Sequence, residues 1–261
     1  MDNLESLSLM FPTSGTNTGY DSNHPFTSNI RLFDGACNVH IARVTAGYDL
    51  FHPNMLHLPW SQLTGLDFED TTLPSSFNQT HTVLRQCVNL QSLRIGIADD
   101  DKCGISRLNT LLPHLESMTV FTFNMTVDWN EYGRFLRPFV LPSLKHLEIV
   151  SCFGKSVWPE EAPHVFKPCC LQNLECLEAQ QLEPAAVLVF LEAVPLLCEL
   201  SLPSFKSKDG LEDLAPFIGD GDVVPLLRKL EWNVDDLDWL IVILERRTKT
   251  DGGDNGDKDE N

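Results

Sequence analysis

One short pattern of apolar residues constrains the fold of this chain more than any other feature. In the stretch Leu141–Cys152 the pattern is L-x-x-L-x-[LI], with Leu144, Leu147 and Ile149 at the apolar positions. The last two of these lie two residues apart, and this spacing places both side chains on the same face of a β-strand. A single strand of this length has nothing against which to bury that face. The pattern therefore predicts that the chain repeats it.

The same frame of three apolar positions recurs along the whole chain. Successive frames begin 23 to 35 residues apart. Their mean separation of about 28 lies near the top of the range, roughly 20–29, that is typical of leucine-rich repeats. Nine frames are found, and they begin at Leu4, Val39, Leu63, Leu90, Leu115, Leu144, Leu174, Leu197 and Leu227. Nine frames at this spacing indicate a stacked array of similar units.

The segments between the frames have apolar residues at helical spacing. We expect helices or helical turns in the segments 83–88, 105–112, 135–139, 184–194 and 211–218. Each unit would then consist of a strand, a turn and a helix. Stacked units of this kind predict an irregular α/β leucine-rich-repeat solenoid, with parallel strands on the concave face and helices or helical turns on the convex face.

The two ends of the chain differ from its middle. Residues 1–235 are expected to form the leucine-rich-repeat array, and residues 236–249 a capping helix at its C-terminal end. The inner face of that helix is predicted to carry Leu237, Leu240, Ile241 and Leu244. Residues 250–261 are rich in glycine and aspartate, which predicts a disordered acidic tail.

Charge and composition limit the classes of partner. The formal net charge of −18 argues against nucleic acid, because phosphate contacts require clustered lysine and arginine. No apolar run approaches the roughly 20 residues that span a membrane. Eight cysteines without framework spacing, together with an acidic start that does not resemble a signal peptide, predict a cytoplasmic or nuclear protein with reduced thiols. An acidic body favours basic or apolar protein partners.

Two phrases of the sequence are more specific than the frame itself. They are LPWSQLTGL at residues 58–66 and LRQCVNLQSL at residues 84–93, and LPSLKHL at residues 141–147 is of the same kind. With them, residues 30–235 resemble the leucine-rich-repeat region of fungal F-box proteins. The resemblance implies that the repeats hold a protein substrate, while an F-box docks on the Skp-type adaptor of a cullin–RING ubiquitin ligase. No F-box precedes the first repeat in this sequence, so adaptor binding is expected only if one lies upstream.

The sequence offers little that could carry out a reaction. His164, Cys169, Cys170 and Cys176 lack the paired spacing of a zinc site. Residues 99–101 are three aspartates, but they lack the alternating ligands, the glycine turn and the closing glutamate of a calcium loop. Nucleotide-binding loops and nucleophile elbows are absent from the sequence. We therefore expect no metal, no cofactor and no enzymatic activity.

The polar positions within the frames are the candidate partner contacts. Strand alternation turns them away from the core and onto the concave face. We expect a protein substrate or partner to contact Arg94, Lys145, His146, Glu148, Glu178, Glu199 and Lys229. The alternative for each residue is an ordinary solvated sheet face. For the whole chain, the alternatives are a repeat-only scaffold or truncated fragment without a ligase role, and an uncharacterised enzyme.

Overall fold

The computed structural model describes all nine frames and parts of the segments between them. The described residues are 4–10, 38–45, 57–68, 77–97, 109–122, 135–151, 168–180, 184–203, 214, 218–219, 224–232 and 241–246. Within these ranges, no helix is long and apolar enough to cross a membrane.

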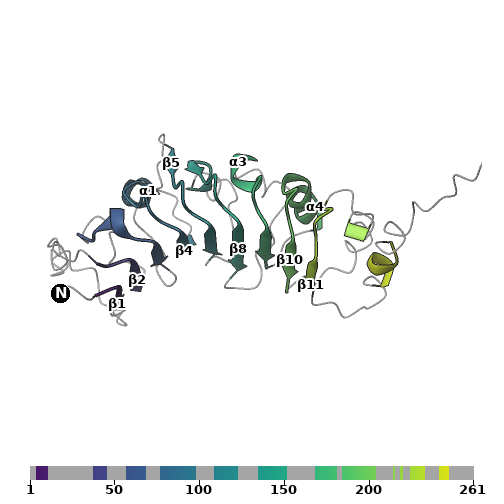
Figure 1. Ribbon diagram of the computed structural model, residues 1–261, viewed down its shortest axis with the longest axis horizontal. Coiled ribbons are helices and arrows are strands. Elements are labelled where there is room, and N and C mark those ends of the chain that lie inside the picture. Colours follow the sequence, from purple (N-terminus) through teal and green to yellow (C-terminus); the bar gives the residue numbers. More distant parts are fainter. Residues whose placement is uncertain are drawn as a thin grey trace, which may run out of the picture.

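A nine-stranded sheet, parallel throughout, forms the centre of the molecule (Figure 1). Its strands follow one another in chain order, apart from two short strands that form a separate pair. They are β1 (Ser6–Met10), β2 (Ile41–Thr45), β3 (Gly65–Phe68), β4 (Ser92–Ile97), β6 (Ser117–Thr122), β8 (His146–Ser151), β9 (Cys176–Ala179), β10 (Glu199–Leu202) and β11 (Lys229–Trp232). Each strand coincides with one predicted frame, so the prediction of an α/β fold with parallel strands at these positions is confirmed.

The frame residues of neighbouring strands lie opposite one another. Leu93 on β4 pairs with Met118 on β6, and Met118 pairs with Leu147 on β8. These three side chains are buried, and they belong to one apolar core that runs through the sheet. Because strand side chains alternate between the two faces, the residues between them point to the opposite face of the sheet. The core register therefore also fixes the register of the exposed face.

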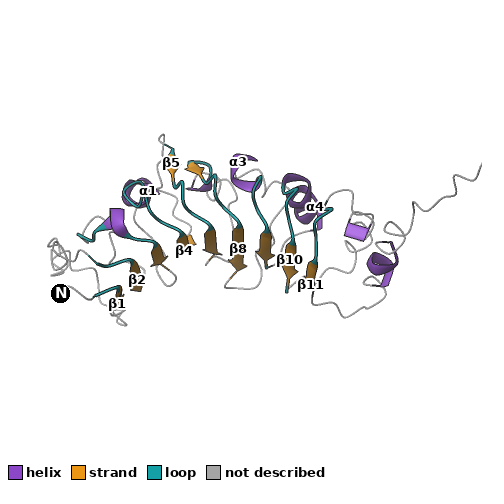
Figure 2. Ribbon diagram, in the orientation of Figure 1, coloured by secondary structure: helices purple, strands orange, loops and turns teal. Residues whose placement is uncertain are grey.

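Short helices lie along one side of the row of strands (Figure 2). They are η3 (Trp60–Gln62), α1 (Phe77–Leu84), α3 (Pro168–Leu171) and α4 (Pro184–Ala193). α3 and α4 begin at proline, which suits a first helical turn because its missing N–H would have no partner there. Val187, Phe190 and Leu191 of α4 join the same core as the strands. The helix predicted for residues 184–194 is confirmed.

Two other predicted helical segments contain strand. β5 (Thr110–Leu111) pairs in parallel with β7 (Phe139–Val140), so the prediction of helix for residues 105–112 is wrong in its described part. In the segment 135–139, only the first two residues are helical. A short apolar run fits the helical and the strand period about equally well. Pairing two neighbouring connections satisfies their backbone groups, which local sequence cannot anticipate.

A buried histidine joins three of these connections. His81 on α1 receives a hydrogen bond from Thr110 Oγ1 at Nδ1 (2.7 Å) and donates from Nε2 to the carbonyl oxygen of Phe135 (2.9 Å). The assignment follows because a carbonyl oxygen only accepts. Its ring also contacts those of Phe135 and Phe139, with centroids 5.1 and 4.8 Å away. Burial lowers the pKa of His81 to about 4, so this histidine is neutral in the folded protein.

The C-terminal helix is described over residues 241–246. A side chain at Gly219 would lie 3.0 Å from Arg246, so this helix packs closely on residues 218–219. Ile243 is buried, whereas Ile241 and Leu244 are about half exposed. The predicted inner face is therefore wrong for these two residues, because the helix is rotated so that Ile243 points inward. The rest of the predicted segment 236–249, the tail and Cys152 lie outside the described residues.

Candidate interaction surface

Three rows of side chains run across the sheet, one along the edge where the strands begin and two on the face opposite the core. The edge row consists of the residue just before each strand, and backbone hydrogen bonds connect its members: Glu5, His40, Thr64, Gln91, Glu116, Lys145, Glu175, Cys198 and Arg228. The first face row consists of the first residue of each strand: Ser6, Ile41, Gly65, Ser92, Ser117, His146, Cys176, Glu199 and Lys229. The second face row lies two residues further on: Ser8, Arg43, Asp67, Arg94, Thr119, Glu148, Glu178, Ser201 and Glu231.

The seven predicted contact residues all lie in these rows. Lys145 belongs to the edge row. His146, Glu199 and Lys229 belong to the first face row, and Arg94, Glu148 and Glu178 belong to the second. Six of the seven lie on or just before the neighbouring strands β8 to β11, and only Arg94, on β4, is separate from them. The sheet therefore brings most of the predicted set together.

The N-terminal part of the face carries two arginines and one aspartate. Arg43 Nε donates to Asp67 Oδ2 at 2.8 Å, which pairs the second face row of β2 with that of β3. The guanidinium carbon of Arg94 lies 5.1 Å from the centre of the Phe121 ring, within the range of a cation–π interaction. Sequence reasoning missed Arg43 and Asp67, although they occupy the same frame position as Arg94.

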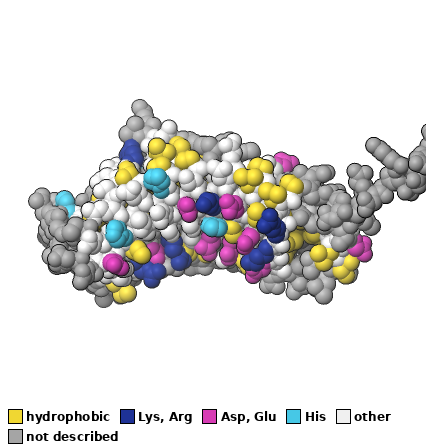
Figure 3. All heavy atoms as spheres, viewed as in Figure 1, with side chains coloured by type: hydrophobic (Ala, Val, Ile, Leu, Met, Phe, Trp, Pro, Cys, Tyr) yellow, Lys and Arg dark blue, Asp and Glu magenta, His cyan; other side chains and the backbone are white. Residues whose placement is uncertain are grey.

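The C-terminal part of the face is rich in carboxylates. Glu148 accepts a hydrogen bond from Thr119 Oγ1 (2.8 Å), and its neighbour in the register is Glu178. Lys229 lies between Glu199 (3.6 Å) and Glu231 (3.8 Å). Partial burial raises the pKa of Glu178, and the nearby carboxylates of Glu148 and Glu231 raise it further. Figure 3 shows acidic and basic side chains gathered over the central and C-terminal strands.

His146 and Cys176 are neighbours in the first face row but do not form an activated thiol. Burial raises the pKa of the Cys176 thiol, and the carboxylates of Glu199 and Glu178 add to this effect. A nucleophilic cysteine requires the opposite environment, one that stabilises the thiolate. Among the described residues, no three histidine, cysteine or acidic side chains are grouped so as to hold a metal ion. His164 and the side chain of Cys169 lie outside the described part.

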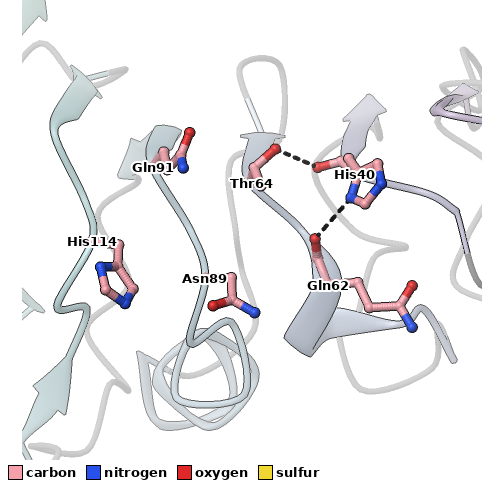
Figure 4. A pocket seen from close by; sticks show the side chains of 6 residues that line it. All are labelled: His40, Gln62, Thr64, Asn89, Gln91 and His114. Atoms are coloured by element: carbon pink, nitrogen blue, oxygen red, sulfur yellow. Dashed lines mark hydrogen bonds between the residues drawn. The ribbon is translucent and has the colours of Figure 1, made fainter.

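A polar hollow of about 450 Å³ opens at the strand edge of the N-terminal part (Figure 4). Three edge-row residues, His40, Thr64 and Gln91, line it together with the residues Gln62, Asn89 and His114 of the preceding turns. His40 Nδ1 donates to the carbonyl oxygen of Gln62, and Thr64 Oγ1 donates to that of His40, both at 3.3 Å. Sequence reasoning missed the hollow because its lining lies outside the strands.

A ladder of side-chain hydrogen bonds runs along the same edge. In three turns, the residue before the first frame leucine donates to a backbone carbonyl of the preceding unit: Asn89 to Ser61 (2.7 Å), Ser143 to Pro113 (2.6 Å) and Asn173 to Pro142 (2.7 Å). The two following units have Leu196 and Leu226 at this position, and both leucines are exposed. The position before the first frame leucine thus changes from polar to apolar after β9.

Comparison of the sequence with protein-family models finds no match, and no curated protein matches it either. The structural support for a function therefore comes from the arrangement of the three rows.

Proposed function

We propose that the chain is a leucine-rich-repeat solenoid that binds a protein partner on the concave face of its strands. The observation that carries the proposal is the continuity of the two face rows across nine parallel strands in chain order. Parallel sheets are ordinarily covered on both faces. The second face of this sheet carries ionised and polar side chains in register, so it is suited to contact with another protein.

The resemblance to F-box proteins supports the proposed repeat fold more strongly than it supports the identity of any partner. Its two longest phrases contribute Trp60, Leu63, Cys87 and Leu90, and all four side chains are buried in the core. Buried apolar residues are needed at such positions in any unit that stacks on its neighbours. The residues that would distinguish one substrate from another belong to the face rows, which these phrases barely include.

The wider role follows from the same resemblance. We infer a substrate-holding part of a cullin–RING ubiquitin ligase, with a Skp-type adaptor bound only where an F-box is present. The free thiols of Cys87, Cys170, Cys176 and Cys198 suit a cytoplasmic or nuclear protein. Binding rather than catalysis fits the open face and the protonated Cys176 thiol.

Charge reversal on the face tests the proposal. The double variant Glu148→Lys, Glu178→Lys should capture its partner from extract at least about tenfold less well, because two adjacent negative charges of the face are inverted. Glu192→Lys is the matched control, since Glu192 is exposed on α4, away from the face rows. Partners are identified by mass spectrometry, and thermal unfolding shows that the variants are folded. Equal capture by the double variant and the control would contradict the proposal.

A further inference from the structure

In the C-terminal part of the sheet, two exposed leucines take the place of the asparagine or serine of the hydrogen-bond ladder. Leu196 and Leu226 are 41% and 42% exposed, although leucine side chains in this protein are otherwise mostly core residues. They occupy equivalent turns of consecutive units, directly before the frame leucines Leu197 and Leu227. Single exposed leucines are common, but two at equivalent positions of adjacent units form a small apolar patch.

The position of this patch relative to the face rows follows from the repeat. In the N-terminal part, the ladder residue Asn89 and the edge-row residue Gln91 line one hollow, so ladder position and edge row share a surface. Leu196 and Leu226 accordingly lie beside the edge row of β10 and β11. Figure 3 shows hydrophobic side chains next to the charged group over the C-terminal strands.

The two face rows of β8 to β11 have an excess of negative charge, whereas the edge row between them and the patch holds Lys145 and Arg228 against Glu175. On β8 to β11 these rows hold four carboxylates, those of Glu148, Glu178, Glu199 and Glu231, against the single amine of Lys229. Lys229 already contacts two of the four. Partial burial raises the pKa of Glu178, and repulsion by the carboxylates of Glu148 and Glu231 raises it further, while Lys229 acts in the opposite direction. A cation placed over the second face row would relieve this repulsion.

We infer that the C-terminal part of this surface docks a basic, amphipathic segment of a partner protein. Lysine or arginine side chains of that segment lie over Glu148, Glu178 and Glu231, and its apolar side chains cover Leu196 and Leu226. The inference deepens the proposed function and rests on it. Charge complementarity decides against the other occupants, because nucleic acid, an anionic membrane or a second copy of the same face would bring further negative charge to the carboxylates.

Short synthetic peptides test the inference on the full-length chain. A peptide of alternating lysine and leucine is compared with lysine–serine and glutamate–leucine versions by fluorescence anisotropy. The lysine–leucine peptide should bind at least about tenfold more tightly than either of the others, because it alone satisfies both the carboxylates and the leucine patch. Its affinity should fall as salt is raised.

Variants locate the binding site. Leu196→Asn with Leu226→Asn installs the residue type used by the polar ladder, and it should reduce binding of the lysine–leucine peptide to that of the lysine–serine peptide. Leu111→Asn is the matched control, because Leu111 is also exposed but lies on β5, outside the sheet face. Glu148→Gln with Glu178→Gln should remove most of the salt dependence.

The outcomes separate this inference from the proposed function. Equal binding of the glutamate–leucine peptide, or no effect of the leucine and glutamine variants, would overturn the inference. If charge reversal at Glu148 and Glu178 still abolishes capture of a natural partner while these peptides fail, the sheet face binds a partner of different chemistry. If capture is also unaffected, the proposed function fails as well.

Discussion

The two halves of the strand edge have the same backbone register but different chemistry. In the turns before β4, β8 and β9, the side chains of Asn89, Ser143 and Asn173 each donate to a backbone carbonyl of the preceding unit, and a buried histidine joins the connections behind them. Before β10 and β11, the same turns present Leu196 and Leu226. The core therefore fixes the stacking of units, while edge and face positions vary without changing it. Differences in these positions, not in the frame, are where function should be sought.

The largest effect is expected for His81 in the polar half. His81→Ala should lower the free energy of unfolding by about 3 kcal/mol, because it leaves a cavity and deprives Thr110 and the carbonyl of Phe135 of their partner. Urea unfolding measures the change. The exposed His114 provides the control, since His114→Ala should have little effect. Similar values for the two variants would mean that His81 does not join the connections.

Acid should weaken the protein through the same residue. The folded-state pKa of His81, about 4, lies below its usual value of 6.5, so the unfolded chain binds a proton that the folded chain excludes. The contribution of neutral His81 to the free energy of unfolding is fully present above pH 6.5 and is lost as the pH falls toward 4. Between pH 7 and pH 5 the loss attributable to His81 should be about 2 kcal/mol.

The difference between wild type and His81→Gln isolates that contribution, because glutamine does not titrate and all other groups are shared. Free energies of unfolding are measured for both proteins across this pH range. Parallel pH profiles for the two proteins would show that His81 is not held neutral.

A smaller effect is expected from the ladder. Asn173→Ala should cost about 1 kcal/mol, the usual contribution of one hydrogen bond. Thermal unfolding at neutral pH measures it. The control is Gln172→Ala, an exposed neighbour in the same turn. A change no larger than the control's would indicate that the ladder is a by-product of stacking.

The smallest effect is expected for the exposed leucines before β10 and β11. Leu196→Asn should leave stability unchanged or raise it by up to about 0.5 kcal/mol, because the new amide can reach the backbone carbonyl of the preceding turn. The same unfolding assay detects it. A clear loss of stability would show that Leu196 packs against the fold, and would remove it from the proposed docking surface.

The sequence predicts the sheet well because its signal is local and repeated. Leu93 and Ile95 fall on the buried side of β4, as their spacing requires, and Leu90 is buried just before the strand. The other frames behave in the same way, except that the apolar residues of β1 and β11 at the two ends of the sheet are only partly buried. The positions between them were predicted to lie on the opposite face, which the register confirms although Asp67 and Thr119 are buried there, and the sheet gathers most of the chosen residues on β8 to β11. The strand period alone is sufficient for both results.

Contacts between units could not be predicted in this way. β5 and β7 pair across 29 residues, and His81 contacts Phe135 across 54. Nothing in the local sequence of these segments specifies its distant partner. The ladder could have been predicted, because asparagine or serine precedes a frame leucine in several units. That position lies outside the strand, however, and the strand period does not draw attention to it. The exposed leucines become conspicuous only when compared with these asparagines and serines.

The central claim is that partners dock on the second face row of the C-terminal strands. A photoreactive p-benzoylphenylalanine introduced at Glu178 tests it directly, with the same residue at Glu192 on α4 as the reference position. Position 178 should cross-link to a partner and position 192 little or not at all, and the cross-linked peptide should be rich in lysine or arginine. Cross-linking from position 192 alone would contradict it.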